Sequence, residues 1–265
     1  MPCFLDAHCH LQDEQLASVL SEVFSSEIRA WIVNGTSPAD WGSVAALADR
    51  DKRVIPAFGW HPWELTECPP EDSFERLRRY LELYPNAHVG EIGVDRWKEG
   101  LEDHLQIECL VKQIEIAAEF SRPVTLHCLK AWELLEKAWK EAKDHPKRML
   151  LHAFNGSIEI AETWIDRGGY FSFSTYFLHA RKEKIRTVFA KLPIDRLLLE
   201  TDAPAMAPPS EFCIGKVNSN TNIRLNHPVN IKLAYSALAD IRSLDAEQLE
   251  VQVGQNFEKF NGSQI

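Results

Sequence analysis

Short apolar runs alternate with longer amphipathic segments along most of the chain. Eight runs have the length and nearly continuous apolar character of strands that are covered on both faces of a parallel sheet. They begin near Phe4, Ala30, Val54, Ala87, Pro123, Met149, Tyr170 and Arg196. Apolar residues recur at helical spacing between them, most clearly over 104–120. This rhythm predicts an α/β fold, a (β/α)8 TIM barrel.

A doubly wound open sheet is the alternative fold. A dinucleotide-binding version of that fold has no support, because no Gly-x-Gly-x-x-Gly follows the first run. The stretch 203–228 is rich in proline and lacks periodicity, and loops of that length are usually functional or disordered. Two helical patterns follow, over 229–241 and 249–260. We therefore expect one domain over 1–265, a barrel with extra C-terminal helices.

Composition narrows the class of protein. The chain of 265 residues is 45% apolar and carries a formal net charge of -10. The negative charge argues against a protein that binds long nucleic acid over its whole surface. A local basic run, 179–186, follows the seventh strand. The six cysteines are scattered without a Cys-x-x-Cys, as in reduced cytosolic proteins. With no apolar stretch of membrane length or leader pattern, we expect a cytoplasmic protein without membrane association or a stable protein partner.

The first strand carries the first candidate metal ligands. Residues two apart in a strand point to the same side, so His8 and His10 can aim both imidazoles at one point. Imidazole suits zinc and other first-row divalent metals. Asp6 has the same parity, and we expect it to hold one ring in a single tautomer.

Further residues of ligand type stand at the ends of other predicted strands. These are Glu91, His127, His152, Glu200 and Asp202. The C-terminal ends of barrel strands form one face, where active sites lie, so these side chains should converge.

This mixture of imidazoles and carboxylates suits two divalent ions (Zn, Mn or Mg), with Glu91 as the best candidate to bridge them. Asp202 could bind a metal and take a proton from water. The predicted chemistry is hydrolysis by a metal-bound hydroxide, and no Gly-x-Ser-x-Gly competes with it.

Eight segments together resemble the TatD family of metal-dependent deoxyribonucleases, within the amidohydrolase-like barrels. They run in family order and include Asp-Ala-His-Cys-His-Leu at 6–11 and Leu-Leu-Leu-Glu-Thr-Asp-Ala-Pro at 197–204. The others are 59–62, 90–95, 123–127, 151–156, 169–174 and 226–228.

The resemblance implies a TIM barrel with a two-metal site that hydrolyses DNA phosphodiesters, often from the 3′ end of single strands. It implies metal-ligand roles for His8, His10, Glu91, His127, His152 and Asp202. It also places His61 near the substrate phosphate and Glu200 beside Asp202 as a supporting residue. The implied partner is a nucleic acid end, single-stranded DNA in particular.

The chain departs from the family pattern at Trp63, Leu129 and Leu225, where polar residues that can contact phosphate are common. Each departure removes a possible phosphate contact, so a small ester remains an alternative substrate. The alternative enzyme is a metal-dependent ester, lactone or amide hydrolase, including one that deacylates aminoacyl-tRNA. A third hypothesis is a non-catalytic binding protein whose barrel has lost its enzymatic activity. The complete set of ligand-type residues argues against it. Trp60, Trp63 and Trp97 follow the third and fourth strands and either stack bases or pack loops.

Overall fold

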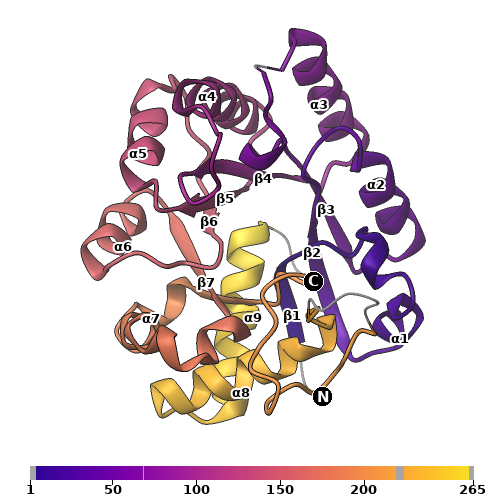
Figure 1. Cartoon of the computed structure of the whole chain (residues 1–265), viewed down its shortest axis with the longest axis vertical. Coiled ribbons are helices and arrows are strands. Elements are labelled where there is room, and N and C mark those ends of the chain that lie inside the picture. Colours follow the sequence, from indigo (N-terminus) through magenta and orange to yellow (C-terminus); the bar gives the residue numbers. More distant parts are fainter. Residues whose placement is uncertain (1–3, 68, 219–223, 263–265) are drawn as a thin grey trace.

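The computed structural model describes residues 4–67, 69–218 and 224–262. Eight strands form one parallel sheet whose spatial order is the chain order (Figure 1). The strands are β1 (Phe4–Cys9), β2 (Ile28–Asn34), β3 (Val54–Phe58), β4 (His88–Asp95), β5 (Val124–Leu129), β6 (Met149–Leu151), β7 (Gly169–Ser174) and β8 (Leu197–Glu200).

The sheet closes on itself where β8 meets β1. The Asp202 amide donates to the His8 carbonyl at 2.9 Å, and the His10 amide donates to the Ala203 carbonyl at 2.8 Å. These bonds join the first and last strands at their C-terminal ends. The barrel prediction is therefore confirmed, and the open-sheet alternative is wrong.

Helices lie around the strands and across one end of the barrel (Figure 1). They are α1 (Leu20–Phe24), α2 (Trp41–Arg50), α3 (Glu71–Leu83), α4 (Asp103–Glu119), α5 (Trp132–Glu141), α6 (Ile158–Ile165), α7 (Glu183–Phe189), α8 (Ile231–Arg242) and α9 (Ala246–Asn261). Short 3-10 helices add η1 (Glu14–Leu16), η2 (Pro62–Glu64), η3 (Thr175–Leu178), η4 (Ala180–Lys182), η5 (Ile194–Arg196) and η6 (Pro228–Asn230). Within the described ranges, no helix is long and apolar enough to span a membrane.

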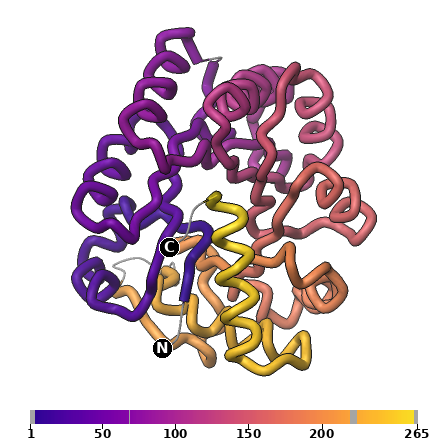
Figure 2. The backbone as a smooth tube through the Cα atoms, turned by 180° about the vertical axis from the view of Figure 1, so that it is seen from behind, coloured from indigo at the N-terminus to yellow at the C-terminus, as the bar shows by residue number. Residues whose placement is uncertain are grey.

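The last helix, α9, crosses the N-terminal end of the barrel (Figure 2). Its Phe257 and Phe260 are fully buried in a cluster with Leu5 and Tyr170 from the barrel strands. Asn261 lies 2.9 Å from the imidazole of His88, at the start of β4. The predicted C-terminal helices are therefore present, and α9 closes the end of the barrel that lies opposite the candidate site.

Two expected strands differ in their boundaries, and the expected long loop is present. The sixth strand ends at Leu151, short of the apolar run, because Ala153 turns the chain with a φ of 42°. β4 continues to Asp95, beyond the expected end of its run. The long loop after β8 contains no helix or strand over its described parts, 203–218 and 224–227.

Four of the six cysteines lie within the described ranges. Cys9 and Cys128 are buried free thiols, Cys109 is buried, and Cys213 is partly exposed and free. Cys3 and Cys68 lie outside the described residues.

Candidate metal centre

Glu91 stands at the centre of the predicted site, on the fully buried strand β4. Its Oε2 lies 3.4 Å from His8 Nε2 and 3.3 Å from His10 Nε2. Its other oxygen, Oε1, lies 2.8 Å from His152 Nε2 and 3.0 Å from His127 Nδ1. A single carboxylate thus presents each of its oxygens to a different pair of imidazoles.

Asp202 completes the first of these two groups. Its Oδ1 lies 3.3 Å from Nε2 of both His8 and His10. The residue has a φ of 56°, in the left-handed region that Asp tolerates better than most residues, and its amide is bonded to the His8 carbonyl. The six residues predicted as ligands therefore come together at the C-terminal ends of β1, β4, β5, β6 and β8.

A close approach between β4 and β5 helps to bring Glu91 and His127 together. The residue between Glu91 and Asp95 on the same side of β4 is Gly93, where an added Cβ would lie 2.0 Å from the His127 carbonyl oxygen. Only glycine lets the two backbones pass this closely.

Two groups orient imidazoles from outside the cluster, and neither was predicted. His10 Nδ1 lies 2.7 Å from the Asn34 carbonyl, and His127 Nε2 lies 2.8 Å from Asp95 Oδ2. Each bond places a proton on that nitrogen and leaves the other nitrogen directed at Glu91. The sequence offers a signal for Asp95, because it is four positions after Glu91 in a strand and shares its side. It offers none for Asn34, which acts through its backbone.

His61 reaches the same cluster in a different protonation pattern. It precedes the 3-10 helix η2, and its Nδ1 accepts a hydrogen bond from the Trp63 amide at 3.1 Å. Burial lowers the pKa of His61 to about 4, so the ring is neutral and carries its proton on Nε2. That nitrogen lies 3.3 Å from Glu91 Oε1. His61 is therefore arranged as a hydrogen-bond donor into the site, whereas a ligand nitrogen would need to be unprotonated.

Glu200 supports the turn that follows His152. Its Oε1 accepts the Ala153 amide at 2.8 Å, its Oε2 accepts the Ser172 hydroxyl, and Oε1 lies 3.7 Å from His152 Nδ1. The turn needs this support because Ala153 has a positive φ.

The expected role of Asp6 is wrong. Between the pairs Asp6–Trp31 and Cys9–Val33, β1 has one residue more than β2, so a bulge interrupts the two-residue alternation. The Asp6 carboxylate accepts the amide and hydroxyl of Thr201 at 3.0 and 2.6 Å and the His8 amide at 3.3 Å. It therefore fixes the backbone beside Asp202 and does not bond to an imidazole among the described residues.

The site is electrostatically coupled. Burial alone would raise the pKa of Glu91, but the nearby imidazoles, His152 foremost, hold it well below its usual range. Burial would likewise lower the pKa of His10 and His152, and the neighbouring carboxylates raise both well above the usual value. The shifts favour protonated, positively charged imidazoles at His10 and His152 beside an ionised Glu91. The positive charge that a bound metal ion would bring is thus supplied by protons.

The residues fit bound divalent metal. Within the part of the chain that the structure describes, both ring nitrogens of His8 are buried without a hydrogen-bond partner, which is unusual for a polar group with no exposed surface. Ligand atoms of three overlapping groups lie within 4.8 Å of one another: His8, His10 and Glu91; His8, His152 and Asp202; and His61, Glu91 and His127. Imidazole and carboxylate donors of this kind suit Zn and Mn.

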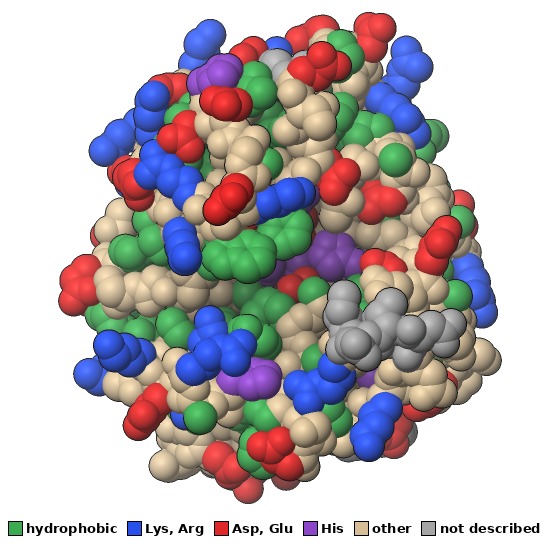
Figure 3. Space-filling view, viewed as in Figure 1, with side chains coloured by type: hydrophobic (Ala, Val, Ile, Leu, Met, Phe, Trp, Pro, Cys, Tyr) green, Lys and Arg blue, Asp and Glu red, His purple; other side chains and the backbone are tan. Residues whose placement is uncertain are grey.

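The opening to this cluster lies on the face shown in Figure 3. Histidine side chains are visible in a hollow that hydrophobic side chains, lysines and arginines border. The basic run 179–186 after β7 does not direct all of its cations to solvent, because Arg186 donates to the His179 carbonyl at 3.0 Å. Arg181 and Lys182 lie over the Tyr176 ring, each 5.2 Å from its centre.

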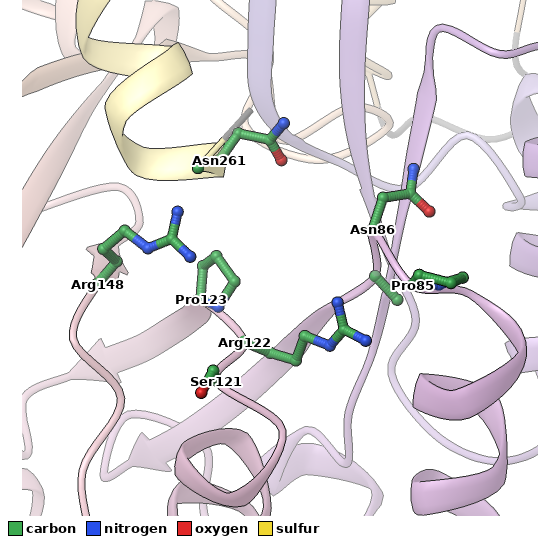
Figure 4. Close-up of a pocket in the computed structure, with 9 residues that line it drawn as sticks. Pro85, Asn86, Ser121, Arg122, Pro123, Arg148 and Asn261 are labelled. Carbon is green, nitrogen blue, oxygen red and sulfur yellow. The ribbon is translucent and has the colours of Figure 1, made fainter. Parts of the chain in front are cut away.

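A separate cavity of about 310 Å³ lies at the other end of the barrel (Figure 4). Arg122, Arg148, Asn86 and Asn261 are among its lining residues. Among the described residues that line it there is no histidine, cysteine or carboxylate.

Comparison with known proteins agrees with this geometry. Residues 5–262 match the family described as TatD related DNase. The chain is 33% identical to the uncharacterized metal-dependent hydrolase YjjV of Escherichia coli, over 77% of this chain and 80% of that protein. It is 26% identical to human deoxyribonuclease TATDN3, over 95% of this chain and 92% of that protein. The crystal structure of YjjV superposes with a TM-score of 0.84 at 27% identity, covering 97% of each chain. The chain therefore belongs to the TatD family of metal-dependent hydrolases.

Proposed function

We propose that this protein is a metal-dependent phosphodiesterase that removes nucleotides from the ends of single-stranded DNA. One observation carries the proposal: the two carboxylate oxygens of Glu91 face different imidazoles. Oε2 faces His8 and His10, and Oε1 faces His127 and His152. A carboxylate so placed can bridge two cations, the arrangement that suits in-line displacement at phosphorus. We infer a site for two divalent ions, of which Zn, Mn and Mg are candidates.

The proposed ligands form two sets around Glu91. His8, His10 and Asp202 would hold one ion, and His127 and His152 the other. Bound divalent ions would supply Lewis acidity and make water a nucleophile at neutral pH.

The remaining chemistry belongs to the side chains of the chain. Asp202 would orient the attacking water and accept its proton, and His61 would donate its Nε2 hydrogen to a phosphate oxygen. Asp6 and Glu200 would position the two loops that carry Asp202 and His152.

The opening supports a chain end as substrate in preference to a small buried ester. Trp63 is 38% exposed and Trp97 is 56% exposed, so the aromatic side of the opening faces solvent. Two of the three residues that depart from the family pattern are engaged within the protein: Leu225 is buried, and the Trp63 indole donates a hydrogen bond to Asp95. The Erwinia tasmaniensis relative named 3'-5' ssDNA/RNA exonuclease TatD, 27% identical over 90% of both chains, points to the same substrate class.

The test is hydrolysis of an end-labelled single-stranded oligonucleotide, without metal and with Mg²⁺, Mn²⁺ or Zn²⁺. We expect stepwise shortening that needs metal and is lost in Asp202→Asn, with the shortened end giving the polarity. A matched control is Asp103→Asn, an exposed carboxylate paired with Arg96, which should leave the rate unchanged. No cleavage by a metal-loaded protein would refute the nuclease and direct the search to esters, lactones and amides.

A further inference from the structure

Two exposed tryptophans form a stacked pair beside the metal centre. Trp63 lies in η2 after β3, and Trp97 follows β4. Their ring centres are 6.0 Å apart and their planes differ by 26°. Such an exposed aromatic surface costs solubility unless something covers it. Hydrophobic side chains border the opening in Figure 3, and the exposed fractions of Trp63 and Trp97 are 38% and 56%.

The pair is fixed to the ligand cluster by a shared acceptor. Trp63 Nε1 donates to Asp95 Oδ2 at 2.9 Å, and the same oxygen lies 2.8 Å from His127 Nε2. The Trp63 ring centre is 5.3 Å from that of His61 and 6.1 Å from that of His127. The pair therefore begins directly at the edge of the metal centre.

The loop that carries Trp97 is held in place before any ligand arrives. Asp95 Oδ1 accepts the amides of Trp97 at 2.6 Å and Lys98 at 2.8 Å. A surface that is already ordered loses little conformational entropy when it binds a flat group. The exposed Trp97 side chain is thus presented on a rigid turn.

A cation accompanies the aromatic pair. Lys98 Nζ lies 5.3 Å from the centre of the Trp63 ring and donates to the Trp63 carbonyl at 3.2 Å. It has no carboxylate partner within 4–67, 69–218 and 224–262, so its charge is available to an anion. A flat π surface with a neighbouring cation matches a base and its phosphate, the combination used by proteins that bind single strands.

We propose that Trp97, backed by Trp63, is a stacking platform for the nucleobase next to the scissile phosphate, with Lys98 meeting the adjoining phosphate. This inference rests on the proposed nuclease function and specifies its substrate. Stacking reads the presence and size of a base without reading its hydrogen-bonding edge. The enzyme should therefore require a base, favour purines over pyrimidines and tolerate any sequence.

The first test compares two oligonucleotides that differ only at the cleaved end, one with adenine and one with an abasic deoxyribose. We expect the adenine substrate to be preferred in kcat/KM by roughly 5- to 150-fold in the native protein. Trp97→Ala should bring this ratio close to one, mainly through KM, and Trp97→Phe should retain most of it. Phe212→Ala removes an aromatic side chain of similar exposure, 48%, outside the pair and should keep the ratio.

A binding measurement separates this proposal from the nuclease assignment. Calorimetry on the metal-loaded protein would compare deoxyadenosine monophosphate with deoxyribose 5-phosphate. We expect the nucleotide to bind more tightly by a similar factor, and Trp97→Ala to lose that advantage. If oligonucleotides are not cleaved, the nuclease assignment fails, and the calorimetry still decides the platform. Equal binding of the two probes, or an unchanged ratio in Trp97→Ala, would overturn the platform.

Discussion

Replacing Asp95 by Asn should weaken the metal centre without replacing any of the proposed metal ligands. The carboxylate accepts hydrogen bonds on both oxygens: Oδ1 from the amides of Trp97 and Lys98, and Oδ2 from His127 Nε2 and Trp63 Nε1. An amide has one oxygen, so one of these two pairs of donors must face an NH2 group. Neither the two backbone amides nor the Trp63 indole can change from donor to acceptor, whereas His127 can exchange its tautomer. An NH2 group that faces His127 and Trp63 therefore leaves one unmatched donor, and one that faces the backbone amides leaves two. We therefore expect the amide nitrogen to face His127.

The magnitude follows from that exchange. An imidazole that accepts at Nε2 carries its proton on Nδ1, the nitrogen that lies 3.0 Å from Glu91 Oε1 and should bind metal. Loss of such an orienting partner typically costs 10- to 100-fold in metal affinity or activity, about 1.4 to 2.8 kcal/mol. Burial alone would raise the pKa of Asp95, yet the hydrogen bonds from His127, Lys98 and Trp63 bring it to about 2. That shift corresponds to about 2 kcal/mol in favour of the ionised form, which an uncharged Asn cannot provide.

The assay is a competition between protein and a chelator for metal, with hydrolysis measured at saturating metal. Asp95→Asn should hold metal more weakly, and unfolding by urea should show a loss of about 1–3 kcal/mol in stability. Asp103→Asn, on an exposed carboxylate near the same loop, should change neither quantity by more than about 0.5 kcal/mol. Native metal affinity and native activity in Asp95→Asn would refute the reasoning.

Three further predictions concern proton uptake, His61 and the closed end of the barrel. Burial would lower the pKa of His10 and His152, but Glu91 and its neighbours raise both, so metal must displace protons. Affinity should fall as pH decreases from about 8 to about 6, and calorimetry in two buffers should detect proton release; a pH-independent affinity would contradict this. His61→Gln should lower kcat/KM by about 100-fold with the bound metal unchanged, and loss of metal would instead make His61 a ligand. Phe257→Ala should cost about 3–5 kcal/mol in urea unfolding, against less than about 0.5 kcal/mol for the exposed Val251→Ala, and equal effects would be inconsistent with α9 as a packed closure.

Part of the site was predictable because barrel topology turns sequence position into spatial position. Each of His8, Glu91, His127, His152 and Asp202 lies in or just after a strand, and the C-terminal ends of parallel barrel strands meet on one face. No contact had to be known to bring them together. Their roles as ligands remain a prediction, as do the single domain and the cytoplasmic location.

The details of orientation were not predictable in the same way. The Asp6 carboxylate bonds to the amide and hydroxyl of Thr201, and this contact depends on how β1 meets the segment that follows β8. The Asn34 carbonyl that orients His10 belongs to another strand and has no side-chain signature. The protonation of His61 depends on a single amide in the turn that follows it.

The sequence alone therefore determined which elements form and which residue types reach the C-terminal face, because both follow from local periodicity and chain order. The tertiary structure alone decided which atoms meet there. It showed that Glu91 divides its oxygens between two sets of imidazoles, and that Asp95 joins His127 to the tryptophan pair. The reason is geometric, because a hydrogen bond depends on tenths of an ångström between strands that are distant in sequence.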